Sequence, residues 1–140
     1  MQKFLDNIHI SGTAYKGKPL DAKKLIACQR KLKLNNFPLI PQEYVVFLHK
    51  YNSLACDGRW LFGVCPRDES DLDILAENAL ALVTNKTTNL VLGYSELEYL
   101  LWNENNGNYQ IVDKSDFEVL KTYSACKDAL KDFLRLDDCY

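Results

Sequence analysis

The sequence predicts an α+β fold with an antiparallel sheet and with helices packed on one side of the sheet and at its ends. Of the 140 residues, 47% are hydrophobic, so the chain can bury a core of its own. Short strand-like segments joined by turn residues follow one another in the second half, while the helical patterns lie mainly before and after them. No internal repeat, low-complexity tract or Gly/Ser linker interrupts the chain, so we expect residues 1–140 to form one domain.

Two helices are predicted in the first half of the chain. The first begins after Asp21, a residue type that caps helix N-termini. Its apolar stripe at helical spacing consists of Leu25, Cys28 and Leu32. The second is opened by Pro41 at its first position, where a missing N–H is harmless. Its buried face, with spacing i, i+3, i+4 and i+7, is predicted to consist of Tyr44, Phe47, Leu48 and Tyr51.

A short strand and a third helix are predicted next. Residues 59–64 have the composition of a strand bounded by Gly58 and Pro66. Ser70 and Asp73 have the spacing of a capping box, which predicts that a helix begins there.

The second half of the chain is predicted to be mainly sheet. Strands are expected at residues 90–92, 98–103 and 109–113. Asn106 and Gly107 both tolerate positive φ, so we expect a tight hairpin turn between the last two strands. Ser124 is expected to cap a closing helix. The buried face of that helix consists of Cys126, Ala129, Leu130, Phe133 and Leu134.

Charge and hydropathy limit the classes of partner. Lys and Arg number 17 and Asp and Glu number 19, and this balance is too close to neutral for bulk attraction to nucleic acid or an anionic membrane. The basic residues of segment 16–33 lack the aromatic platform of a nucleic-acid site, so we expect them to form a solvated helix face. The chain has no apolar run of bilayer length and no signal-peptide pattern, so we expect a cytoplasmic protein.

The cysteines and histidines do not indicate an enzyme. The five cysteines include no C-x-x-C pair, and their odd number argues against a disulfide framework; they are Cys28, Cys56, Cys65, Cys126 and Cys139. His49 with Cys56 or Cys65 is the combination that resembles a thiol nucleophile and its base. No oxyanion site accompanies it, and His9 and His49 lack metal-ligand spacing. We therefore expect no catalysis, no metal and no cofactor.

An ordered set of motifs resembles the SUKH superfamily. In the first half the motifs are FPLIP at 37–41, YxxFLxxxN at 44–52 and LFG at 61–63. In the second half LVLGYS at 90–95, YLLW at 99–102, GxYQIVD at 107–113 and the terminal amphipathic helix resemble its YrhA-like branch. The resemblance covers about residues 20–134. Ser53 departs from the family pattern, which often has Gly after the Asn, and this puts the turn at that position in question.

The resemblance implies an α+β domain without catalysis that binds another protein. Members of the superfamily are commonly bacterial immunity proteins that bind and neutralise a secreted toxin, and several of these toxins are nucleases. For this chain we expect neutralisation by occlusion. The alternative is a regulatory or scaffolding domain that binds an endogenous protein. Because a nuclease is usually basic around its active site, an acidic surface on its inhibitor would steer their encounter.

The candidate partner-binding residues are acidic or aromatic. Segment 68–77 has five acids and no base, and we select from it Asp68, Glu69, Asp71 and Asp73. The same acids would also interact favourably with a helix N-terminus, which requires no partner. Tryptophan is enriched at interface hot spots, so the other candidates are Trp60 and Trp102 with the neighbouring charges Asp57 and Glu104. A buried core position is the preferred explanation of either tryptophan. Tyr94, Tyr99 and Tyr109 could line a binding groove, but they also fit strand pairing.

Overall fold

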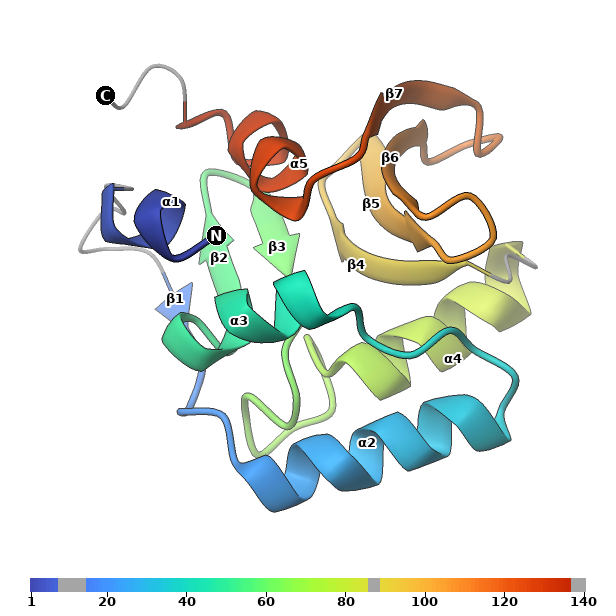
Figure 1. Ribbon diagram of the computed structural model, residues 1–140. Coiled ribbons are helices and arrows are strands. Elements are labelled where there is room, and N and C mark those ends of the chain that lie inside the picture. Colours follow the sequence, from blue (N-terminus) through green and yellow to red (C-terminus); the bar gives the residue numbers. More distant parts are fainter. Residues whose placement is uncertain (8–14, 86–88, 137–140) are drawn as a thin grey trace.

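The computed structural model describes residues 1–7, 15–85 and 89–136, and it has a mixed α+β fold (Figure 1). The strands of these residues form one antiparallel sheet whose order follows the chain. They are β1 (Tyr15–Lys16), β2 (Leu54–Cys56), β3 (Arg59–Leu61), β4 (Leu90–Tyr94), β5 (Glu98–Asn103), β6 (Asn108–Asp113) and β7 (Val119–Tyr123). The predicted α+β class with an antiparallel sheet is confirmed.

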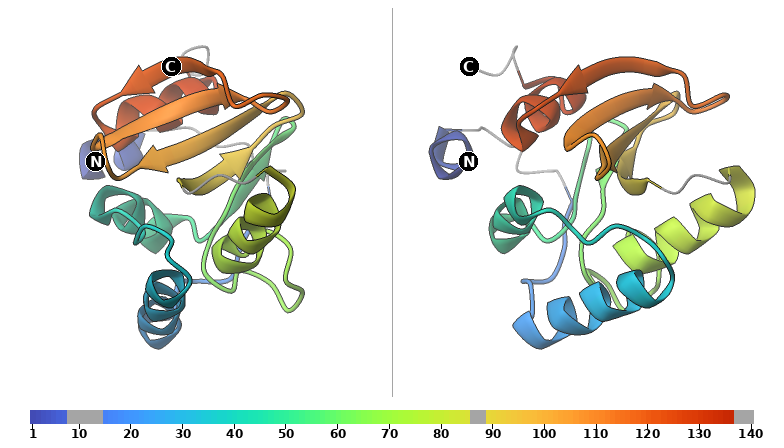
Figure 2. Two further views of the ribbon diagram at one scale, coloured as in Figure 1. Left: turned by 90° about the vertical axis from the view of Figure 1, so that its right-hand side faces the viewer. Right: turned by 45° about the vertical axis from the view of Figure 1, so that its right-hand side comes forward.

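The helices pack around this sheet in different ways. They are α1 (Gln2–Asn7), α2 (Ala22–Leu34), α3 (Gln42–Lys50), α4 (Ile74–Asn85) and α5 (Cys126–Phe133). Helix α5 packs on β6 and β7, α4 packs on β4, and α3 contacts both α1 and α5. Helix α2 packs on α4 and lies farthest from the strands in every view (Figures 1 and 2).

The first two predicted helices are present, with one difference at Pro41. The Asp21 Oδ1 atom accepts hydrogen bonds from the backbone N–H groups of Lys23 (2.8 Å) and Lys24 (3.3 Å), so Asp21 caps α2 as predicted. Pro41 lies one residue before the first helical residue of α3, at φ −66°, and not at the first helical position. Its ring still sets the entry into the helix.

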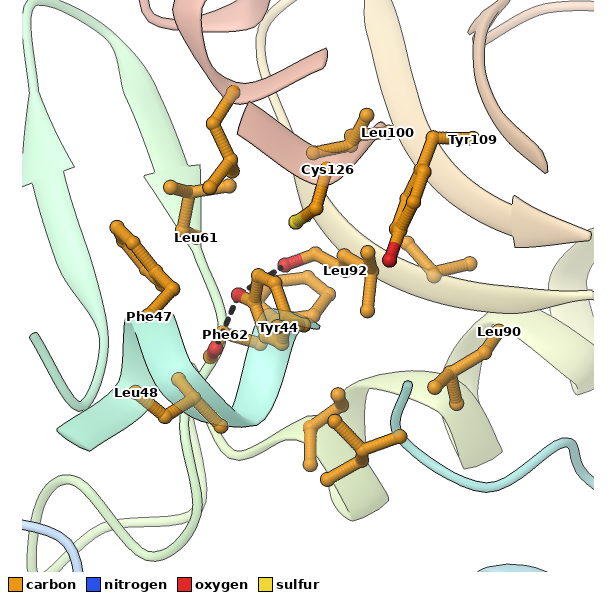
Figure 3. Close-up of a cluster of buried hydrophobic side chains, with 14 of the residues drawn as sticks. Tyr44, Phe47, Leu48, Leu61, Phe62, Leu90, Leu92, Leu100, Tyr109 and Cys126 are labelled. Carbon is orange, nitrogen blue, oxygen red and sulfur yellow. Dashed lines mark hydrogen bonds between the residues drawn. The ribbon is translucent and has the colours of Figure 1, made fainter. Parts of the chain in front are cut away.

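Helix α3 is linked to the sheet by the hydroxyl of Tyr44 (Figure 3). Tyr44, Phe47 and Leu48 are buried as predicted, whereas Tyr51 is half-buried beyond the end of the helix. The Tyr44 hydroxyl lies 2.6 Å from the carbonyl oxygen of Phe62 and 3.2 Å from that of Leu92. It therefore fixes α3 where the chain leaving β3 meets β4. Burial raises the pKa of Tyr44, which keeps this donor protonated.

The closing helix has the predicted buried face but a different N-cap. Ala125 occupies the N-cap position of α5 and makes no side-chain capping bond, so the predicted role of Ser124 is wrong. The apolar side chains of α5 and of Leu134 are nevertheless buried against the sheet. Burial of this face holds the helix in place without a polar cap.

One strand and one hairpin turn differ from the sequence-based expectation. The predicted strand 59–64 ends at Leu61, and it pairs with β2 through a two-residue turn of Asp57 (φ 50°) and Gly58 (φ 75°). Positive φ at both positions is the requirement of a type I′ turn. Between β5 and β6 the loop spans residues 104–107, and of its residues only Gly107 has positive φ. The predicted tight turn at Asn106 and Gly107 is therefore a four-residue loop.

Asn52 links three chain segments near the start of β2 and the end of β3. Its Oδ1 accepts from the Val64 N–H (2.7 Å), while its Nδ2 donates to the carbonyls of Lys18 (2.8 Å) and Val64 (2.9 Å). Ser53 adopts φ 84°, a conformation that favours glycine, and its hydroxyl donates to the Leu61 carbonyl at 2.8 Å. Ser53 thus adopts a backbone conformation that is typical of glycine, and the hydrogen bond of its side chain offsets part of the strain of that conformation.

Candidate partner-binding face

A row of aromatic side chains crosses three neighbouring strands on one face of the sheet. In the register Trp60 of β3 lies opposite Tyr94 of β4, which lies opposite Tyr99 of β5. The Trp60 and Tyr94 rings stack at 5.1 Å, and the Tyr99 ring stacks on Phe117 at 5.3 Å. All four side chains are half-buried, so part of each ring faces solvent. We call Trp60, Tyr94, Tyr99 and Phe117 the aromatic face.

Lys114 holds a positive charge over this aromatic face. Its Nζ lies 4.6 Å from the centroid of the Tyr94 ring and 5.4 Å from that of Tyr99. It also donates a hydrogen bond to the Ser95 carbonyl at 3.2 Å, and its backbone N–H donates to the Leu97 carbonyl at 2.9 Å. These contacts fix the lysine, because a cation is attracted to the negative face of an aromatic ring.

Two hollows open beside the aromatic face. A pocket of about 240 Å³ lies between the rings and α4, lined by Phe62, Glu77, Leu80, Val91, Tyr94, Tyr99 and Lys114. A cleft of about 300 Å³ lies at the other side of Trp60, and its lining includes Asp57, Arg59, Leu97 and Arg135. Leu80 and Leu97 are 59% and 72% exposed, so each hollow has an apolar residue that a partner could cover.

Glu77 is the acidic group of the pocket beside α4. Burial raises the pKa of its carboxyl above the ordinary value, and the nearby carboxylates of Asp71 and Asp73 raise it further. The charge of Lys114 acts in the opposite direction. The pocket thus combines aromatic rings with a partly desolvated acid.

Trp102 and Glu104, two of the predicted binding residues, lie away from the aromatic face. Tyr99 and Trp102 are three residues apart on β5, so their side chains point to opposite faces of the sheet. Trp102 packs against Tyr109 at 4.7 Å and is half-buried. Glu104 lines a separate cleft of about 270 Å³ with Asn36, Phe37 and Pro38. The two tryptophans therefore do not belong to one surface.

The predicted acidic segment is partly neutralised by two bases. Lys18 forms an ion pair with Asp68, and Arg67 reaches both Glu69 (2.7 Å) and Asp71 (3.0 Å). The hydrogen bond from Lys18 lowers the pKa of Asp68. Although residues 68–77 contain no base, the fold brings Lys18 to them from 50 positions away in the sequence. The acidic surface is therefore weaker than the segment's composition suggests.

Asp73 has a structural role in the same segment. Its carboxylate accepts hydrogen bonds from the backbone N–H groups of Cys65 (2.9 Å) and Ala76 (3.1 Å), so Asp73 caps α4. Ser70 contributes only a backbone carbonyl, to Asp73, so the capping-box prediction is wrong about which side chain caps the helix.

Asp73→Ala is expected to lower the free energy of unfolding by about 1–2 kcal/mol, the usual effect of losing an N-cap. Urea denaturation followed by circular dichroism measures this change. Asp71→Ala is the matched control, because it removes an exposed ion pair, and we expect the smaller loss from it. Equal losses in the two variants would contradict the capping role.

The cysteine and histidine side chains are distributed over several elements. Burial raises the pKa of Cys28 and of Cys126 to about 12, which keeps both thiols protonated. Cys65 and His49 are exposed, and Cys56 is half-buried in β2. His9 and Cys139 lie outside the described residues.

Over residues 1–7, 15–85 and 89–136, no three His, Cys, Asp or Glu side chains converge in a way that could hold a metal ion. Within the same residues, none of the helices combines the length and apolar character needed to cross a bilayer.

Of the predicted binding residues, Trp60 and Asp57 lie at or beside the aromatic face. Sequence reasoning preferred strand pairing to a binding groove for Tyr94 and Tyr99, and did not select them. The signal that unites these rings is strand register, because they come from three strands. Comparison of the chain with protein-family models, with curated proteins and with solved structures found no match.

Proposed function

We propose that this chain is a non-catalytic protein-binding module that acts by covering a surface of its partner. The observation that carries the proposal is the aromatic face, where half-buried Trp and Tyr rings lie between two hollows with exposed leucines. Tryptophan, tyrosine and arginine dominate interface hot spots. The two aromatic residues bury much area with little loss of side-chain entropy. Arg59 and Arg135 beside Trp60 add to this composition.

The specific form that we propose is a cytoplasmic immunity protein that neutralises a toxin, possessing no bond-making chemistry of its own. The motifs from residue 37 to residue 113 that resemble the SUKH superfamily support this form. The alternative is a regulatory or scaffolding domain that uses the same face to bind an endogenous protein. Both forms require a stable complex, and they differ in what the partner does.

Coexpression with the product of an adjacent gene tests the proposal. We expect a stoichiometric complex in size-exclusion chromatography with light scattering, and we expect the partner's toxicity to disappear when the two chains are equimolar. A complex with a non-toxic partner would favour the regulatory alternative. A monomer that forms no complex with adjacent products and does not protect cells would contradict the immunity role.

The acidic segment allows a kinetic prediction for that complex. In the triple variant Asp68→Asn, Glu69→Gln and Asp71→Asn, we expect the association rate at low salt to fall by no more than about threefold. The reason is that Lys18 and Arg67 already compensate these acids. Stopped-flow or surface plasmon resonance at two salt concentrations measures the rate, and a fall of about a hundredfold would restore the segment as the main steering surface.

A further inference from the structure

The pocket beside α4 combines three chemical features. Its floor is aromatic, because the Tyr94 ring lies 5.7 Å from Phe62 and Tyr99 lies opposite Tyr94 in the register. Its walls hold one acid, Glu77 of α4, and one base, Lys114 of the loop after β6. Helix α4, which carries Glu77, packs beside β4, which carries Tyr94 (Figure 1).

Among the described residues, the Glu77 side chain has neither an ion pair nor a hydrogen bond. Lys114, the base whose charge acts on Glu77, is held by Ser95 and the two rings. A carboxylate that is partly removed from water without a partner is unfavourable. A cationic ligand in the pocket would remove this penalty.

The charges around the pocket favour a cation. Asp71 and Asp73, which lie outside the pocket lining, both act electrostatically on Glu77, and Lys114 is the base that acts on it. The rings already attract one cation, because Lys114 Nζ lies over Tyr94 and Tyr99. Asp71 is paired with Arg67, which leaves Glu77 and Asp73 against Lys114. The resulting excess of negative charge is complementary to a positive side chain.

The aromatic rings and the single carboxylate of the pocket favour arginine over lysine. A guanidinium is planar, so it can stack on a tyrosine ring and donate two parallel hydrogen bonds to one carboxylate. An ammonium cannot do both, and it is more strongly hydrated. The exposed Leu80 at the rim would pack along the aliphatic part of the arginine side chain.

We propose that the pocket formed by Glu77, Tyr94, Tyr99 and Lys114 binds an arginine side chain of the partner protein. The guanidinium lies over the tyrosine rings and donates to the Glu77 carboxylate, while Lys114 remains at the Ser95 side of the pocket. This inference rests on the proposed function, because it assigns the partner a basic residue as its anchor. The arginine would then be buried when the aromatic face is covered.

A titration with a small arginine probe tests the site without the partner. The probe is N-acetyl-arginine methylamide, and its matched control is the citrulline compound, which has the same shape but a neutral urea group. Aromatic ¹H–¹³C spectra of the full chain report the Tyr94 and Tyr99 rings. We expect saturable shifts of these signals with the arginine probe. The apparent affinity for the citrulline compound should be at least tenfold lower.

Three variants make the result decisive. Glu77→Gln is expected to weaken probe binding about tenfold, whereas Lys114→Gln, which removes a like charge, is expected to strengthen it. Glu118→Gln removes an exposed carboxylate outside the pocket and should leave the affinity unchanged. A partly unfolded pocket would weaken binding in both pocket variants, so opposite signs exclude that explanation.

Equal shifts with citrulline, no saturable shift, or an unchanged affinity in Glu77→Gln would overturn the inference. The outcome is separable from that of the proposed function. If a protein partner binds Glu77→Gln as tightly as the unmodified chain, the arginine site is wrong while the binding module stands. If the probe binds as expected but no protein partner is found, the pocket stands and the proposed function fails.

Discussion

Replacing Gly63 by alanine is expected to lower the free energy of unfolding by about 3 kcal/mol or more, a large share of the roughly 5–15 kcal/mol of a typical domain. A Cβ atom at this position would lie 2.7 Å from the Asn52 carbonyl carbon and 2.7 Å from the Ser53 nitrogen, and closer still to Asn52 Oδ1. Two of these atoms belong to backbone, so they cannot rotate away. The hydrogen bonds that Asn52 makes to Val64 and Lys18 would have to shift with them.

Chemical denaturation monitored by tryptophan fluorescence measures this effect. Gly58→Ala is the matched control, because nothing lies within 4 Å of its added Cβ, although its φ of +75° is unfavourable for alanine. We expect a loss of about 1 kcal/mol for the control, the usual difference between alanine and glycine in the left-handed region. Similar losses at both positions would show that close packing against Asn52 is not what requires glycine.

Replacing Trp60 by alanine is expected to weaken the complex with the partner about 30-fold, which corresponds to about 2 kcal/mol of a typical hot-spot residue. Trp60 is half-buried, stacks on Tyr94 and lines the cleft with Arg59 and Arg135, so its loss removes one wall of the cleft and the stacking partner of Tyr94. Because short-range packing is lost, the effect should lie in the dissociation rate. Isothermal titration calorimetry and surface plasmon resonance measure the affinity and the rates.

Trp102→Ala is the comparison for this experiment, since Trp102 is also half-buried but lies on the opposite face of the sheet. We expect Trp102→Ala to destabilise the fold and to leave the affinity of the folded fraction within about threefold of the unmodified chain. Thermal melts of both variants separate stability from binding. A larger loss of affinity from Trp102→Ala would place the interface on the other face, beside Glu104.

Periodicity in the sequence was sufficient for helices α2, α3 and α5 and for the central strands, whereas the six-residue helix α1 was not predicted. The stripes of α2, α3 and α5 and the strands β4, β5 and β6 each contain enough residues to display their repeat. Strands β1 and β2 have two and three residues, which is too short for any pattern. Strand β7 is missed for another reason, because four of its five residues are exposed and it lacks an apolar/polar alternation.

The candidate site shows where sequence reasoning ends. Asp57 and Gly58 form a recognisable hairpin signal, and it would have paired β2 with β3. The pairing of β3 with β4 spans the whole of α4, so no local pattern places Trp60 beside Tyr94. Likewise the ion pair of Lys18 with Asp68 depends on the tertiary fold. Charge and aromatic content were visible in the sequence, but their grouping was not.

The nearest-neighbour order of the sheet also bears on how the chain reaches its native state. Strands β4 to β7 are joined by short loops, so their pairing costs little loop-closure entropy. Each strand of the described residues pairs only with the strands directly before and after it in the sequence. The sheet can therefore grow in the direction in which the ribosome delivers it, and α5 arrives last to close the core over β6.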